Sequence, residues 1–205
     1  MPTIVDVVIA LSEVFARLQL RYAVGGALAN NYWGIVRATE DVDCLITLPA
    51  IQYQQFADEL NHIDCTIISA AGNSAAVTVP NLREQVKQRG LMEFYSRLLD
   101  PPARIELFVP MIPLQNEILR RAIPVYVRGR PIPITTAEDL ILLKLAFHRA
   151  KDLQDVRGIL YVQRGKLDIE YVRHWSAEML EQDVANELEQ LIKQYFSYEG
   201  TESRE

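Results

Sequence analysis

Two aspartates separated by one residue are the clearest sign of chemistry in this sequence. Asp41 and Asp43 flank Val42 in a segment, DVDCLIT, whose apolar residues predict a β-strand over residues 41–47. Side chains alternate between the two faces of a strand, so both carboxylates should project from the same face. Neighbouring carboxylates repel each other unless a cation lies between them, and their oxygens suit Mg²⁺ or Mn²⁺. A divalent metal site is therefore expected at the start of this strand.

A glycine pair upstream offers the second half of such a site. Residues 22–24 predict a short strand, Gly25 and Gly26 interrupt it, and residues 27–33 predict a helix. Glycine lets a backbone approach an anion closely, and a helix N-terminus attracts negative charge. A phosphate-binding turn beside a metal-binding strand predicts phosphoryl or nucleotidyl transfer. The alternative is a strand–helix–strand unit whose aspartates face solvent.

The stretch from Tyr22 to Thr47 also resembles a known signature. Its pattern GG…G..R.T.DVD is similar to that of the nucleotidyltransferase (polymerase beta-like) superfamily, and most similar to the small bacterial group that includes abortive-infection toxins. The resemblance implies an α/β (α+β) fold, with a nucleotidyltransferase-like mixed sheet flanked by helices and further helices at the C-terminus. It also implies an enzyme that uses two divalent metals to move a nucleoside monophosphate from an NTP such as ATP to an acceptor.

The resemblance assigns roles to particular residues. Asp41 and Asp43 would be catalytic and bind Mg²⁺ or Mn²⁺, together with a third carboxylate on a later strand. Glu106 lies in such a segment, ARIELFV over residues 103–109, where the family more often has Asp. Alternatively, Glu106 has no catalytic role and lies on the solvent face of an amphipathic strand. The residues expected at the nucleotide are Gly25, Gly26, Arg37, Thr39, Lys144, Lys151 and Asp155; for Thr39, orienting its loop is the favoured role.

The second informative stretch is a helix predicted from residue 137 onward. If it is continuous, Lys144, His148, Lys151 and Asp155 follow one another at helical spacing and share one face. Lys144 would either reach a triphosphate as a point charge or cover apolar surface with its stem. Residues 151–157 resemble a Lys-Asp-x-x-Asp-Ile/Val-Arg segment of the same group, and suit a charge-paired surface helix equally well.

Length and composition bound the domain organisation. The 205 residues, 49% of them hydrophobic, are enough for one domain with a helical appendage. We expect a nucleotidyltransferase core over residues 1–135 and a helical C-terminal part packed on it over residues 136–197. The polar residues 198–205 are expected to form a frayed tail.

Net charge and cysteine content limit the binding partners and the cell compartment that are expected. A net charge of −6 and a pI of about 5.2 argue against broad binding to nucleic acids. The sequence has neither an apolar run long enough to span a membrane nor a signal peptide, so no membrane partner is expected. Cys44 and Cys65 form no CxxC pair, which favours a cytoplasmic protein without disulfides. One local basic cluster is predicted to be solvated surface, the alternative being that it approaches an RNA or nucleotide phosphate: Arg120, Arg121, Arg128 and Arg130.

Several functions fit these observations. The first is an active nucleotidyltransferase whose acceptor is RNA, protein or a small molecule, in one form the toxin of a toxin–antitoxin pair. The second is an antitoxin that modifies its cognate toxin. The alternative from another class is a catalytically inactive scaffold that keeps the fold and binds a protein partner or a nucleotide. The intact Asp41, Asp43, Gly25 and Gly26 favour the enzymes over the scaffold.

Overall fold

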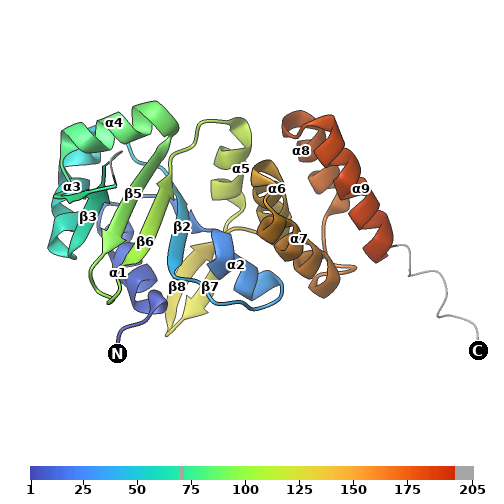
Figure 1. Cartoon of the computed structure of the whole chain (residues 1–205), viewed down its shortest axis with the longest axis horizontal. Helices are drawn as coiled ribbons and strands as arrows, with labels where there is room; N and C mark the ends of the chain where they lie inside the picture. The colour runs from blue at the N-terminus through green and yellow to red at the C-terminus, as the bar shows by residue number, and fades with distance from the viewer. Residues whose placement is uncertain (70–71, 197–205) are drawn as a thin grey trace, which may run out of the picture. The chain divides into compact units, whose positions relative to one another are not determined.

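The computed structural model describes residues 1–69 and 72–196 (Figure 1). Contacts within the chain divide it into two units. The first unit is Met1–Leu28 with Ala38–Thr135, and the second is Ala29–Arg37 with the described residues from Thr136 onward. The frayed tail predicted at residues 198–205 lies outside the described residues.

A mixed sheet of eight strands forms the centre of the first unit, in the order β4-β3-β5-β6-β2-β1-β8-β7. Its strands are β1 (Tyr22–Val24), β2 (Asp41–Ile46), β3 (Cys65–Ile68), β4 (Ser74–Ala75), β5 (Leu91–Ser96), β6 (Ala103–Phe108), β7 (Ile123–Val127) and β8 (Arg130–Ile134). β2 runs parallel to β6 on one side and antiparallel to β1 on the other. The mixed sheet expected from the sequence is thus confirmed.

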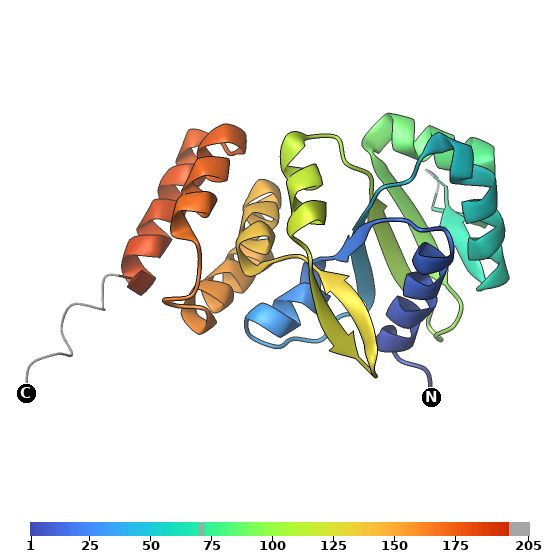
Figure 2. The same cartoon turned by 180° about the vertical axis from the view of Figure 1, so that it is seen from behind.

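Helices pack on this sheet because each has one apolar face. They are α1 (Ile4–Arg17), α3 (Tyr53–His62) after the 3₁₀ turn η1 (Ala50–Gln52), α4 (Val79–Arg89) and α5 (Pro113–Arg121). α1 contacts β2 and β8, and Figure 2 shows it beside the β7–β8 hairpin. Its buried Phe15 stacks on Phe56 of α3 with ring centroids 6.4 Å apart. Cys44 and Cys65 are free and buried in the sheet.

The second unit is helical. α2 (Gly26–Trp33) begins in the first unit and ends in the second, which also contains α6 (Ala137–Phe147), α7 (Ala150–Val162), α8 (Ile169–Met179) and α9 (Gln182–Phe196). α6 packs on α7 and α8, and α9 packs on α7 and α8, with α8 and α9 side by side (Figure 1). Within the described ranges, no helix is both long and apolar enough to cross a membrane.

The continuous helix considered for the second unit is not formed. His148 adopts a left-handed conformation (φ 49°) and ends α6, and its N–H donates to the Lys144 carbonyl. The next helix starts at once, because the Asp152 carboxylate accepts from the Arg149 backbone N–H and binds the Arg149 guanidinium. The shared face proposed for Lys144, His148, Lys151 and Asp155 is therefore wrong.

Candidate active site

The pairing of β2 with β6 brings the predicted catalytic carboxylates next to one another. In this parallel register Asp43 lies opposite Glu106, and Asp41 lies opposite Arg104. Paired residues project from the same face, and so do residues two apart along a strand. Asp41, Asp43 and Glu106 therefore share one face of the sheet. Asp41 is exposed there, whereas Asp43 and Glu106 are half-buried.

A fourth acidic residue, missed in the sequence analysis, extends this arrangement. Glu93 of β5 is paired with Glu106 in the antiparallel register, so Asp43, Glu106 and Glu93 occupy one level across three adjacent strands. We call these three residues the carboxylate row. Glu93 is only 6% exposed. The signal that could have found it is an acid among the apolar residues of LMEFYS, because a charge buried in a strand requires a partner.

Arginines supply that partner. Arg104 contacts Glu93 through Nη2, and its Nε lies 3.2 Å from Glu106 Oε1. Arg89 reaches the other oxygen of Glu93, with Nη2 2.7 Å from Oε2. The hydrogen bond to Glu93 raises the pKa of Arg104 above its already high ordinary value. Arg104 is thus a permanent positive charge shared by two members of the row.

The glycine pair is packed against Asp43. A Cβ atom on Gly26 would lie 1.7 Å from Asp43 Oδ2, and Gly26 has φ +55°, so only glycine suits both requirements. The Gly25 amide donates to the Asp43 carbonyl at 2.8 Å. That amide is therefore engaged and is not free to bind a phosphate. The assignment of Gly25 and Gly26 to the nucleotide stays a prediction.

The close approach at Gly26 predicts unequal effects of two adjacent substitutions. We expect Gly26→Ala to lower the free energy of unfolding by about 1–3 kcal/mol and to displace the Asp43 carboxylate, because it adds both strain and a clash. Gly25→Ala is the matched control, since its Cβ would lie 3.8 Å from Thr135 Cγ2, an ordinary contact. We expect that control to change stability by less than about 0.5 kcal/mol. Urea unfolding measures both, and equal losses would contradict the packing described for Gly26.

The donor chemistry of this face fits a hard divalent cation. Carboxylate oxygens are the ligands that Mg²⁺ prefers. The absence of a side chain at Gly26 leaves room for one of them, the Asp43 carboxylate. The ligands are not gathered around one point, however. Among residues 1–69 and 72–196, no group of three or more His, Cys, Asp or Glu side chains is arranged to hold a metal ion. Glu106, the expected third ligand, is instead engaged by Arg104.

Other predicted nucleotide-binding residues meet in the second unit. The Arg37 guanidinium binds Asp155 with two hydrogen bonds of 3.0 Å each. Lys144 Nζ lies 2.6 Å from Asp155 Oδ2 and 3.7 Å from Asp152 Oδ1. Asn31 holds the backbone of Arg37 through both its N–H and its carbonyl. We call Arg37, Lys144, Asp152 and Asp155 the charge cluster.

Burial makes this charge cluster structurally important. Lys144 is 5% exposed and Asp155 7% exposed, so neither ion is solvated by bulk water. Burial by itself raises the pKa of Asp155, but hydrogen bonds from Arg37 and Lys144 outweigh it and hold that pKa below its usual value.

Two further residues predicted at the nucleotide lie outside the charge cluster. Lys151 is exposed on α7. Thr39 belongs to the first unit, where its hydroxyl lies 3.3 Å from the Asp41 amide and orients the loop before β2.

The lowered pKa of Asp155 predicts a specific acid sensitivity. A carboxyl group whose pKa is lower in the folded state stabilises the fold fully above its unfolded value of 3.8, and loses that contribution as pH falls toward the folded value. We therefore expect the free energy of unfolding of the wild-type chain to fall below about pH 4 more steeply than that of Asp155→Asn. Parallel curves for the two proteins would show that Asp155 is not held ionised by the charge cluster.

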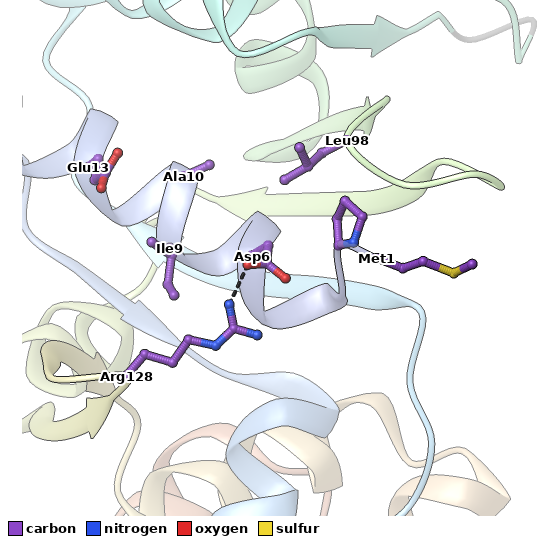
Figure 3. A pocket seen from close by; sticks show the side chains of 8 residues that line it. Met1, Asp6, Ile9, Ala10, Glu13, Leu98 and Arg128 are labelled. Carbon is purple, nitrogen blue, oxygen red and sulfur yellow. Dashed lines mark hydrogen bonds and ion pairs between the residues drawn. The ribbon is translucent and has the colours of Figure 1, made fainter.

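The cavities of the first unit include one at the N-terminus of α1. It has a volume of about 460 Å³ and is lined by residues that include Asp6, Leu98 and Arg128. Figure 3 shows the Arg128 side chain reaching Asp6, with Nη1 2.5 Å from Oδ1. Contacts with the backbone and side chain of Thr3, and then with Arg128, lower the pKa of Asp6 to about 2. Arg130 similarly pairs with Glu13, so the hairpin arginines are bound to α1.

No protein-family model matches the chain, and no curated protein matches it in sequence. An antigenic nucleotidyltransferase-like protein from Paracoccidioides brasiliensis is similar in structure, with a TM-score of 0.54 over 92% of this chain and 91% of that one at 16% identity. The chain has a nucleotidyltransferase-like fold.

Two structures of the antibiotic-resistance factor ANT(2″)-Ia share the nucleotidyltransferase-like fold. Its solution structure matches with a TM-score of 0.53 and 12% identity, over 91% of this chain and 96% of that one. Its complex with adenylyl-2″-tobramycin matches with a TM-score of 0.53 and 14% identity, over 87% and 97% of the two chains.

Within the nucleotidyltransferase-like fold, the predicted site residues fall into two groups. Those of the first unit are Gly25, Gly26, Thr39, Asp41, Asp43 and Glu106, and those of the second are Arg37, Lys144, Lys151 and Asp155. Asp41, Asp43 and Glu106 share a sheet face, whereas Arg37 and Lys144 of the second group are joined by ion pairs to the buried Asp155.

Proposed function

We propose that this chain is a metal-dependent nucleotidyltransferase that moves a nucleoside monophosphate from an NTP to an acceptor. The observation that carries the proposal is the β2–β6 register, which sets Asp43 beside Glu106 and on the same face as Asp41. The close packing of Asp43 on Gly26 adds to it, because the second aspartate and the glycine turn form one unit. The nucleotidyltransferase-like fold supports this assignment.

In the proposed reaction, Asp41 and Asp43 hold one or two Mg²⁺ or Mn²⁺ ions. When bound, these ions neutralise the charge of the transferring phosphoryl group and of the leaving pyrophosphate. The protein itself contributes mainly position: Gly26 fixes the Asp43 carboxylate, and Glu106 completes the site or accepts the proton of the acceptor.

The nucleotide has its own proposed set of residues. The N-terminus of α2, which starts at Gly26, would attract the phosphates. The signature further assigns Gly25, Arg37, Thr39, Lys144, Lys151 and Asp155 to the nucleotide. Because Arg37, Lys144 and Asp155 already bind one another, their first role is to hold the second unit together.

The acceptor is proposed by class. A small molecule is supported by the complex of ANT(2″)-Ia with an adenylylated tobramycin, which also makes ATP the first donor to test. The resemblance of the signature to that of the toxin group supports RNA or protein as the acceptor. The same resemblance supports a cognate toxin or antitoxin as a protein partner in the cytoplasm. The net charge of −6 favours a small molecule or a protein over broad RNA binding.

One observation favours a second function, a scaffold that binds a partner or a nucleotide without catalysis. In the described part of the chain, the acidic side chains are not gathered into a set of three around one point, and Glu106 is paired with Arg104. A scaffold would retain the fold and bind nucleotide while transferring nothing.

Incubation with α-labelled NTPs and Mg²⁺ tests the proposal and sorts the acceptors. Separate reactions contain total RNA, total protein, or a panel of small molecules that includes tobramycin. We expect EDTA-sensitive label in one of the three classes, which would identify the acceptor. Nucleotide binding by a folded protein without label in any class would support the scaffold instead.

A further inference from the structure

Arg104 bridges two members of the carboxylate row, Glu93 and Glu106. We infer that Arg104 is the resident counter-ion of the row, and that a divalent metal must compete with it for Glu106. This inference rests on the proposed function, since it concerns the same metal site. Arg104 lies outside the residues of the nucleotidyltransferase-like signature.

The two contacts of Arg104 differ in their surroundings. Toward Glu93, it meets a carboxylate that is 6% exposed and that Arg89 also binds, at 2.7 Å. Toward Glu106, it offers Nε at 3.2 Å to a side chain that is 25% exposed. The Arg104 side chain is itself 44% exposed. The contact with Glu93 is therefore the anchor, and the contact with Glu106 is the one that can open.

Electrostatics explains why a counter-ion is needed at this place. Like charges directly opposite each other on paired strands destabilise a sheet, and Glu106 has Glu93 on one side and Asp43 on the other. A guanidinium with several donors can bind two carboxylates at once, which offsets their repulsion. Arg104 thus stabilises the row when no metal is bound.

The same charge opposes a metal. A divalent cation bound by Glu106 would lie within a few ångströms of the guanidinium, where like charges repel strongly in a partly buried site. Pairing with Arg104 and binding of a metal therefore compete for the Glu106 carboxylate. Glu106 shares a face with Asp41 and Asp43 but is bound to Arg104. Glu93 would retain Arg104 after Glu106 has turned to the metal.

The test compares two arginines that share one carboxylate. Arg104→Gln removes the charge at Glu106, whereas Arg89→Gln removes a charge from Glu93 alone. Free Mn²⁺ is measured by electron paramagnetic resonance during titration of each protein. We expect Arg104→Gln to bind Mn²⁺ about threefold to tenfold more tightly than wild type, and Arg89→Gln to stay within about twofold.

A second readout is the melting temperature with EDTA and with saturating Mn²⁺. Both variants should melt lower than wild type in EDTA, because each leaves Glu93 with one cation. Saturating Mn²⁺ should raise the melting temperature of Arg104→Gln more than that of Arg89→Gln, since tighter binding stabilises more at a given concentration. In a Glu106→Gln background, the effect of Arg104→Gln on Mn²⁺ affinity should largely disappear.

The outcomes separate this inference from the proposed function. Unchanged affinity in Arg104→Gln would overturn the competition, and weaker binding would show that Arg104 instead positions Glu106 for the metal. Asp43→Asn is measured in the same series. If it binds Mn²⁺ as wild type does, the metal site of the proposed function fails; if it loses Mn²⁺ while Arg104→Gln is unchanged, only the competition fails.

Discussion

Asp43→Asn is expected to reduce nucleotidyl transfer by about a thousandfold or more while leaving the fold intact. Asparagine keeps the size of the side chain and its fit against Gly26, but it replaces a charged oxygen by a neutral amide. A metal loses an anionic ligand, and the triphosphate loses the charge neutralisation that the metal supplies. The initial rate of label transfer measures the loss, and circular dichroism checks the fold.

Glu40→Gln is the matched control for this variant. Glu40 is exposed, lies directly before β2 and carries the same charge, but it belongs to neither the row nor the proposed ligand set. We expect Glu40→Gln to retain wild-type activity. A loss of activity in Asp43→Asn would then result from the position of Asp43 in the site and not from the change in net charge. Full activity in Asp43→Asn would contradict the proposed site.

Lys144→Ala is expected to have the largest effect on stability, about 3–5 kcal/mol in the free energy of unfolding. The substitution leaves Asp155 with Arg37 alone and deprives Asp152 of its contact with a buried cation. Both aspartates keep an arginine, but they are nearly inaccessible to water, so the loss of a buried cation is not offset by hydration. Urea unfolding measures the difference.

Lys151→Ala is the control for Lys144→Ala, because Lys151 is exposed on α7 beside the same two aspartates in sequence. We expect its stability to remain within about 0.5 kcal/mol of wild type. If Lys144→Ala kept its stability but raised the KM for NTP, Lys144 would be a nucleotide ligand as the signature implies, and its structural role in the charge cluster would be wrong.

Much of the fold was accessible from sequence patterns. The apolar residues of segment 41–47 predicted β2, and the segment ARIELFV over residues 103–109 predicted β6. Gly90 ended α4 in the left-handed conformation, as a helix-terminating glycine should. These signals are local, since they depend only on a residue and its near neighbours.

The contacts that define the site were not local. Glu93 and Arg104 are 11 residues apart in sequence and meet only because β5 pairs with β6. Arg37 and Asp155 are 118 residues apart, and no pattern in either segment indicates the other. His148 shows a third limit: helix propensity favoured one continuous helix, but a left-handed residue and the Asp152 side chain divided it.

A comparison of α- and γ-labelled NTP tests the central proposal most directly. Nucleotidyl transfer cleaves the bond between the α- and β-phosphates, so the α label passes to the acceptor and the γ label leaves in pyrophosphate. We expect this distribution for the wild-type chain with Mg²⁺, and none of it in EDTA. A γ label on the acceptor, or no transfer of either label by the folded protein with any class of acceptor, would contradict nucleotidyl transfer at the Asp41–Asp43 site.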